Sequence, residues 1–370
     1  MKKLFLLAAC GLLLVGCVRV TNSSKKQPVV VLPINGIFKT VDQGQTWFQR
    51  GNVYTLDGTK AVVPDLNVTA MVPDPSDANT VYLASDKGIY YTYNRGDGWN
   101  STLATEGVVN SIAVDPNSRC VLYAAAHNKF FKSVDCARSW QKTHFTTLAD
   151  EFYTAIYIPR ANSNVIFLAT SKGTLERSDD AGQSWQVQTF FRDAITGFID
   201  NPSSSTIFYA VQHNDIQETT DAGATWTTLF SLPVHAADAA TDIGKAAAGI
   251  TLAEISGSRT IYDVKYDASQ GDGLIYASGY GIFRLVNREY WQEIEVLNKP
   301  QEQAVYSIAI DGHTGTDLYF TTTGAFYRSA NAGKEWSVRD LPATGVPKFL
   351  YLFPDRADEL MAIFYSPKNK

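Results

Sequence analysis

The sequence predicts an all-β fold in which seven four-stranded antiparallel units close into a single ring. An octapeptide of the form Ser/Thr-x-Asp-x-Gly-x-Ser/Thr-Trp recurs along the chain, and each of the seven tryptophans ends one copy. Short apolar strands separated by Gly, Pro, Asn and Asp turn signals fill the intervals, which is typical of repeated β units. The incomplete units at the two chain ends complement each other, and joining them removes open sheet edges.

The copies of the octapeptide predict a tight hairpin turn. Glycine adopts a positive φ without strain, the Asp or Asn accepts hydrogen bonds from turn N–H groups, and the tryptophan buries its ring against a neighbouring unit. The copies contain these residues: Asp42, Gly44 and Trp47; Asn94, Gly96 and Trp99; Asp135 and Trp140, with Ala137 in the glycine position; Asp180, Gly182 and Trp185; Asp221, Gly223 and Trp226; Asn331, Gly333 and Trp336; and Trp291, whose copy has lost the Asp and the Gly.

The octapeptide resembles the Asp-box, or BNR repeat, of sialidases, sortilin-type receptors, xyloglucan-cleaving propellers and photosystem II assembly factors. The resemblance extends over residues 29–365, and its seven copies imply a single seven-bladed β-propeller. It also implies that the boxes lie between the third and fourth strands of each blade, on the face opposite the usual ligand site. It implies no particular activity.

The spacing of the tryptophans sets the size of each blade. Four intervals of 41 or 45 residues fit four strands and their connections, and the first strands are expected to begin at Val68, Val109, Tyr153, Ile195, Ile261 and Val305. Two intervals are longer, at 52 and 65 residues. The longer one contains an insert, residues 229–259, which forms either a short helix or a lid of small residues and is expected to be dispensable for stability.

The seventh blade is split between the chain ends. Phe349 to Phe353 is expected to form its first strand. Two segments, residues 29–32 and 360–365, both have the pattern of its second strand, and the sequence leaves both open.

Residues 1–16 have the pattern of a lipoprotein signal peptide, with Lys2 and Lys3 before an apolar stretch too short to span a bilayer. Leu14-Val15-Gly16-Cys17 resembles a bacterial lipobox and favours Cys17 as the lipidated first residue, over Cys10 or a plain signal peptide. Residues 17–28 form a polar tether, and residues 29–370 the propeller. The protein is therefore expected outside the cytoplasm, held on a bacterial membrane by lipid alone.

Cys120 and Cys136 are predicted to form a disulfide. They flank a hairpin that turns at His127-Asn128, each eight residues from position 128, and opposed residues in a hairpin lie close together. Exported proteins retain disulfides, although two buried thiols remain the alternative.

Several functions are disfavoured by composition and motifs. A net charge of −5 argues against nucleic-acid binding. His127 and His213 are expected in exposed turns of blades that are not adjacent, so no metal is expected, and the absence of a phosphate loop or Cys/His cluster predicts no cofactor. The Arg-Ile-Pro signature of sialidases is missing, and one propeller lacks the cleft that xyloglucan-cleaving relatives form between two.

The predicted function is a non-enzymatic binding or assembly scaffold for a protein or glycan partner. Variable connections on the face opposite the boxes are the expected binding surface. Phe190, Phe191, Arg192 and His235 are candidate partner-binding residues, and the first three could equally plug the junction between blades. The alternative function is a carbohydrate-active enzyme of the sialidase or glycoside hydrolase type, which requires a convergent pair of carboxylates.

Overall fold

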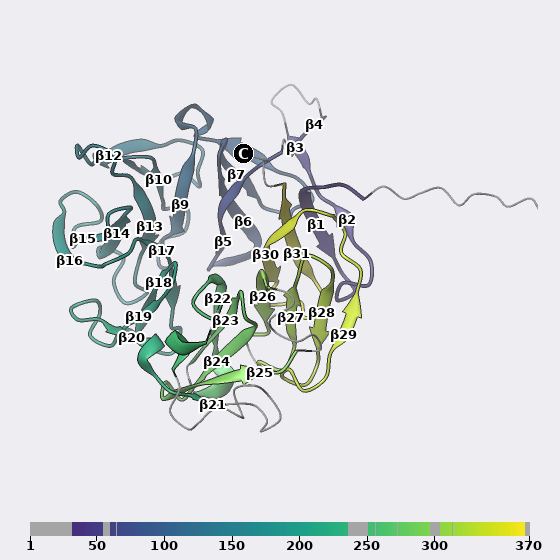
Figure 1. Ribbon diagram of the computed structural model, residues 1–370. Helices are drawn as coiled ribbons and strands as arrows, with labels where there is room; N and C mark the ends of the chain where they lie inside the picture. The colour runs from purple at the N-terminus through teal and green to yellow at the C-terminus, as the bar shows by residue number, and fades with distance from the viewer. Residues whose placement is uncertain are drawn as a thin grey trace, which may run out of the picture. The chain divides into compact units, whose positions relative to one another are not determined.

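The chain folds as a seven-bladed β-propeller, as predicted. The computed structural model describes residues 32–54, 60–63, 65–235, 251–255, 257–271, 273–296, 304–312 and 314–366, and Leu32–Lys370 forms one compact unit. Seven antiparallel sheets surround a common axis (Figure 1), with the first strand of each blade innermost. The only helices among the described residues are short 3₁₀ turns, none of them long and apolar enough to cross a membrane.

Blades 1 to 6 carry their four main strands in chain order from the axis outward. Blade 1 has β5 (Val68–Asp74), β6 (Asp77–Ser85), β7 (Gly88–Thr92) and β8 (Asn100–Thr102). Blade 2 has β9 (Val109–Val114), β10 (Leu122–Ala126), β11 (Lys129–Ser133) and β12 (Gln141–Phe145). Blade 3 has β13 (Tyr153–Tyr157), β14 (Ile166–Thr170), β15 (Thr174–Ser178) and β16 (Gln186–Phe190).

Blade 4 has β17 (Ile195–Asp200), β18 (Phe208–Gln212), β19 (Ile216–Thr219) and β20 (Thr227–Thr228). Blade 5 has β22 (Ile261–Asp267), β23 (Gly273–Ser278), β24 (Ile282–Val286) and β25 (Tyr290–Ile294), with β21 (Val234–His235) added at its outer edge. Blade 6 has β26 (Ser307–Ile310), β27 (Leu318–Thr321), β28 (Phe326–Ser329) and β29 (Ser337–Arg339). A separate hairpin pairs β3 (Asn52–Tyr54) with β4 (Lys60–Val62), and the 3₁₀ turns are η1 (Ala104–Glu106), η2 (Leu229–Ser231), η3 (Leu252–Glu254) and η4 (Ala268–Gln270).

First strands begin at five of the six predicted residues. The exception is blade 6, where β26 begins at Ser307, two residues after Val305. Six first strands contain a bulge near their start. The bulge lies one residue after the start of the pairing in five of them and two residues after it in β30. The alternating pattern of the sequence did not predict these bulges. The bulged residues are Thr69, Asn110, Thr154, Thr196, Tyr262 and Lys348.

Blade 7 joins the two ends of the chain. Its strands are β30 (Val346–Leu352), β31 (Leu360–Tyr365), β1 (Gly36–Thr40) and β2 (Phe48–Gln49), and β31 pairs with both β30 and β1. Residues 360–365 therefore form the second strand. Of the other candidate, residues 29–32, only Leu32 lies within the described residues, and it belongs to no strand.

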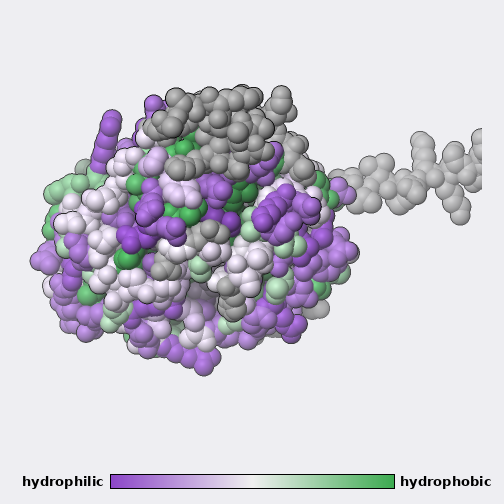
Figure 2. Space-filling model, turned by 90° about the horizontal axis from the view of Figure 1, so that it is seen from below, coloured by the Kyte–Doolittle hydropathy of each residue, from purple (hydrophilic) through white to green (hydrophobic). Residues whose placement is uncertain are grey.

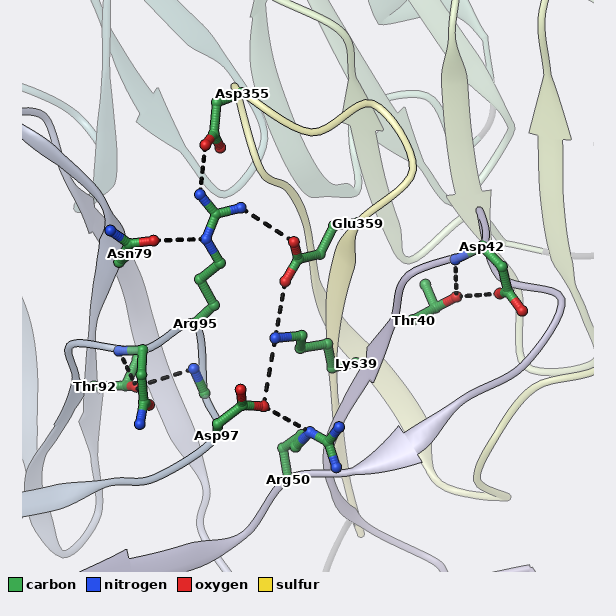
Figure 3. A network of polar contacts seen from close by, with 12 residues as sticks. Lys39, Thr40, Asp42, Arg50, Asn79, Thr92, Arg95, Asp97, Asp355 and Glu359 are labelled. Carbon is green, nitrogen blue, oxygen red and sulfur yellow. Dashed lines mark hydrogen bonds and ion pairs between the residues drawn. The ribbon is translucent and has the colours of Figure 1, made fainter.

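An ion-pair network holds blade 7 against blade 1 (Figure 3). Glu359 accepts from Lys39 at 2.8 Å and from Arg95 at 3.1 Å, and the side chains of Lys39 and Glu359 are each only 8% exposed. Asp97 forms ion pairs with Lys39 and Arg50, and Arg95 also forms an ion pair with Asp355. These contacts join the residues after β7, in blade 1, to β1 and to the turn between β30 and β31, so the point of closure is fixed by charge as well as by strand pairing.

The tryptophans pack against the preceding blade. Trp185 meets Phe130 of blade 2 edge-on with ring centroids 5.1 Å apart, and Trp47 meets Phe326 of blade 6 at 5.4 Å. Apolar side chains from adjacent blades fill the spaces between the sheets, so the core lies in the wedges between blades.

The insert at residues 229–259 is more structural than the sequence predicted. Residues 236–250 and 256 lie outside the described part of the chain. At its ends, Leu229, Phe230, Val234 and Leu252 are buried in one apolar cluster with Trp291 of blade 5. The expectation that the whole insert is dispensable for stability is therefore wrong for its ends, because removing them would empty part of this core.

Candidate functional site

The two ends of the ring are chemically different. Because strands within a blade are antiparallel, the turns between third and fourth strands lie at one end, which we call the box face. The turns between second and third strands and the connections between blades lie at the other end, which we call the loop face.

On the box face, the octapeptides form nearly identical hydrogen-bonded turns. In six copies the hydroxyl of the leading Ser or Thr accepts the N–H at the glycine position at 2.8–3.0 Å. The carboxylate of Asp221 accepts the amide of Thr225 at 2.8 Å and its hydroxyl at 2.6 Å. These bonds lower the pKa of Asp221 to about 2. The box carboxylates are engaged within their own turns, which makes them part of the architecture.

Two consecutive residues of each turn have positive φ. Gly223 has a φ of 90°, as expected for glycine, and Ala222 before it has 58°. The left-handed residue before the glycine was not predicted. Its N–H reaches the turn between the first and second strands of the same blade, as from Ala222 to the carbonyl of Thr206 at 2.9 Å.

This recurring contact explains the disulfide between Cys120 and Cys136. Cys136 occupies the left-handed position of its box, and its N–H donates to the carbonyl of Cys120 at 3.1 Å. The hairpin register used for the prediction is wrong by one residue, since Leu122 pairs with Ser133, which extrapolates to position 135 opposite Cys120. Equivalent residues form the same N–H to carbonyl contact in the five other blades that have a box with this geometry.

The central channel opens between the first strands. It contains a cavity of about 270 Å³, lined in part by Thr69, Asn110, Thr196 and Tyr262. Asn110 donates to the carbonyl of Tyr153 and Thr69 to that of Val109, so bulged residues connect neighbouring blades.

Asp263 is the only carboxylate among the described residues that line this cavity. It accepts from Lys265 at 2.5 Å and from the amide of Ile308 at 3.0 Å. Burial raises its pKa, although Lys265 opposes the shift. A second carboxylate, which two-carboxylate glycoside hydrolysis requires, does not face it from these residues.

A second cavity, with a volume of about 490 Å³, lies on the loop face of blade 4, lined by the connection from blade 3, the turn between β18 and β19, and Arg259 before blade 5. Arg192 and Arg259 line it together with Asp215, Gln212 and Gln217. Arg259 donates to the carbonyl of Asn214 at 3.2 Å, whereas Arg192 is exposed and forms no ion pair with any described residue. Burial raises the pKa of Asp215, and the hydrogen bond from Thr228 opposes this shift.

Exposed apolar side chains lie on the same face as this cavity. Phe190 is 72% exposed, and Phe145, Leu148 and Phe152 are exposed on the neighbouring connection. Phe152 and Ser171 exchange hydrogen bonds, which places this connection beside the turn between β14 and β15. We call Phe145, Leu148, Phe152 and Phe190 the loop-face ridge. By contrast, the side of the ring that carries β21 and β25 shows its hydrophobic residues in small groups among hydrophilic ones (Figure 2).

The structure places the four predicted partner-binding residues in different environments. Phe190 and Arg192 are exposed, whereas Phe191 packs edge-on against Trp226 at 5.4 Å and fills the junction between blades. The backbone of His235 belongs to β21, and its side chain lies outside the described part of the chain.

Other predicted residues are placed as follows. His127 and His213 are exposed in turns between second and third strands. The described part of the chain contains no group of three or more His, Cys, Asp or Glu that could hold a metal ion. Cys17 lies outside the described residues.

Comparisons with known proteins support the fold. No protein-family model matches the chain, and no curated protein matches it. Among solved structures, the GH74 xyloglucanase from Xanthomonas campestris has 15% identity and a TM-score of 0.61 over 88% of this chain and 52% of its own, so this chain spans about half its length. YCF48 bound to D1 peptide has 15% identity and a TM-score of 0.56, over 82% of this chain and 96% of its own. Streptogramin B lyase has 11% identity and a TM-score of 0.57, over 81% of this chain and 94% of its own. These neighbours include both enzymes and a non-enzymatic protein, and at this identity they indicate the fold alone.

Proposed function

We propose that this protein is a non-enzymatic Asp-box propeller lipoprotein that binds a protein or glycan partner through its loop face. The observation that carries the proposal is the loop-face ridge on the same face as a cavity lined by Arg192 and Arg259. Aromatic and arginine side chains are enriched among the residues that dominate binding energy at interfaces. A solved neighbour of similar length, YCF48, binds the D1 peptide, which is a precedent for a peptide ligand on this fold.

The alternative is a glycoside hydrolase, and the GH74 neighbours are its support. The channel weighs against it. Asp263 is the one carboxylate among the described lining residues, and it already accepts hydrogen bonds from Lys265 and Ile308. A general acid and its partner carboxylate would have to come from elsewhere.

The lipid tether at Cys17 has its own test. Replacing Cys17 by Ser should move the protein from the membrane fraction to the soluble extracytoplasmic fraction, because one or more acyl chains would no longer be attached. Retention of the variant on the membrane would exclude the lipobox.

The binding surface is tested by photocrosslinking in intact cells. A photoreactive amino acid at position 190 should form a covalent adduct with one partner, and the same amino acid at position 183, on the box face, should not. Replacing Phe152 by Ser and Arg192 by Ala together should abolish the adduct while the melting temperature stays within a few degrees of the parent. Equal adducts from both positions would contradict the assignment of the binding face.

A further inference from the structure

Two tryptophans are covered by a strand from the preceding connection, and the described residues place no such strand over the other five. Trp99 and Trp291 are fully buried, whereas Trp47, Trp140, Trp185, Trp226 and Trp336 are half-buried. The two covered tryptophans are those that follow the two longest intervals between boxes. Described residues from both of those intervals thus have a common structural use.

The covering segments bind their tryptophans in the same way. At Trp99, Val53 forms a parallel bridge, the carbonyl of Asn52 accepts the backbone N–H at 2.8 Å, and that of Arg50 accepts the indole N–H at 3.0 Å. At Trp291 the parallel partner is Val234. The carbonyl of Pro233 accepts the backbone N–H at 2.8 Å, and that of Leu229 accepts the indole N–H at 2.9 Å. In both cases a valine lies opposite the tryptophan, one residue after the carbonyl that receives the backbone N–H.

Trp47 has the same donors, and no strand among the described residues pairs with them. Its backbone N–H makes no hydrogen bond to another described residue, and its indole N–H is buried without an acceptor. Trp185 and Trp226 also have indole groups of this kind, but His144 and Phe191 pack against their rings. Burying a donor without an acceptor is unfavourable, and an incoming carbonyl would relieve that cost once the groups that cover the indole N–H move aside.

A groove of about 630 Å³ lies beside Trp47 at the rim of the ring. Phe38, Leu341 and Pro342 give it apolar walls, while Gln45 and Gln49 supply uncharged polar groups. The charged residues among its described lining are Arg339 and Asp340, one of each sign, and the guanidinium of Arg339 already donates to the carbonyl of Gln43. The groove therefore suits an extended segment that is largely uncharged.

We propose that the groove beside Trp47 binds an extended segment of a partner polypeptide as an added parallel strand, with a valine or another β-branched residue opposite Trp47. The two intramolecular covering segments are its template, and strand addition of this kind obtains affinity from main-chain hydrogen bonds and specificity from side-chain pockets. The site is separate from the loop face, so evidence against either proposal leaves the other unaffected.

The test uses a synthetic peptide with the sequence of residues 229–235, Leu-Phe-Ser-Leu-Pro-Val-His, titrated into the ¹⁵N-labelled whole chain. The indole N–H signals are followed by NMR, and Trp47→Phe identifies the signal of Trp47. We expect a saturable shift of that signal alone. Trp291 should not respond, because its own segment is held at high effective concentration by the chain. The same peptide with Val234→Asp should produce less than a tenth of the shift at equal concentration.

Three results would overturn the proposal: no shift of the Trp47 signal, an equal shift with the Val234→Asp peptide, or equal shifts of the other half-buried tryptophans. If Trp47→Phe does not fold, a photoreactive residue at the Val234 position of the peptide provides the second measurement. It should crosslink to residues 38–49 or 339–342, and crosslinks confined to other blades would refute the site.

Discussion

Two aspartates at opposite ends of β19 show how the two faces of the ring differ. Asp221, on the box face, is held by Thr225 and Thr219, and its pKa falls to about 2. Asp215, on the loop face, lines a cavity with two arginines, and burial raises its pKa. The box face uses its polar groups to close its own turns, whereas the loop face leaves polar and apolar groups available to a ligand. A repeated turn stabilises the fold, and binding requires the positions where the repeats differ.

The largest effect should come from opening the ring. Deleting residues 349–370 removes β31 and most of β30, including Leu350, Leu360, Met361 and Phe364, all of which are buried. Each large buried side chain contributes about 2–5 kcal/mol, so their sum approaches the whole stability of a typical domain. We expect loss of the cooperative unfolding transition in circular dichroism. Removing only residues 367–370 is the control and should leave the transition in place.

A smaller effect is expected at the ion pairs that close the ring. Glu359→Ala removes the buried partner of both Lys39 and Arg95 and leaves Lys39 only the longer contact with Asp97 at 3.4 Å, which should destabilise the fold by about 3 kcal/mol. Asp355→Ala removes a half-exposed partner of the same Arg95 and should cost less than about 1 kcal/mol. Urea unfolding of both variants measures the difference. Similar values for the two would show that closure does not depend on the buried charges.

The glycine position of the box offers a pair of opposite substitutions. Gly223→Ala places a Cβ 2.6 Å from the ring of Phe167 at a φ of 90°, and should destabilise by about 2 kcal/mol. Ala137→Gly relieves a left-handed alanine with a φ of 66°, and should stabilise by about 0.5 kcal/mol once the greater freedom of unfolded glycine is subtracted. Thermal unfolding should shift in opposite directions, and shifts of the same sign would contradict this account of the turn.

The smallest effect concerns pH. Asp135 and Asp221 have pKa values of about 2 in the folded chain, below the ordinary value of 3.8, because serine or threonine donors hold their carboxylates ionised. A lowered pKa contributes stability that is complete above pH 3.8 and is lost as pH falls towards 2. Asp221→Asn should therefore flatten the decline in melting temperature between these values. An unchanged slope would show that the carboxylate has the same pKa in the unfolded chain.

Repetition made the fold predictable, and the departures from repetition were harder to predict. The tryptophans and glycines of the boxes define blade number and turn position because each turn needs the same backbone conformation. The second strand of blade 7 could not be assigned, since residues 29–32 and 360–365 have equal alternation and only tertiary pairing with β1 distinguishes them. The two arginines of the loop-face cavity are 67 positions apart, between Arg192 and Arg259, and strand pattern does not indicate that they converge.

The insert at residues 229–259 shows a second limit. Its alanine-rich middle suggested a dispensable loop, but Phe230 and Val234 near its start are core residues of blade 5. Their role depends on Trp291, which is 57 residues after Val234, and no local pattern connects them.

Hydrogen–deuterium exchange of the whole chain with its crosslinked partner tests the division between the two faces most directly. Bound partner should slow exchange in residues 146–152, 171–173, 189–194 and 213–217 of the loop face, while the box turns at residues 178–185 and 219–226 exchange as in the free protein. Protection of the box turns without protection of the loop face would contradict the assignment of binding to the connections that vary.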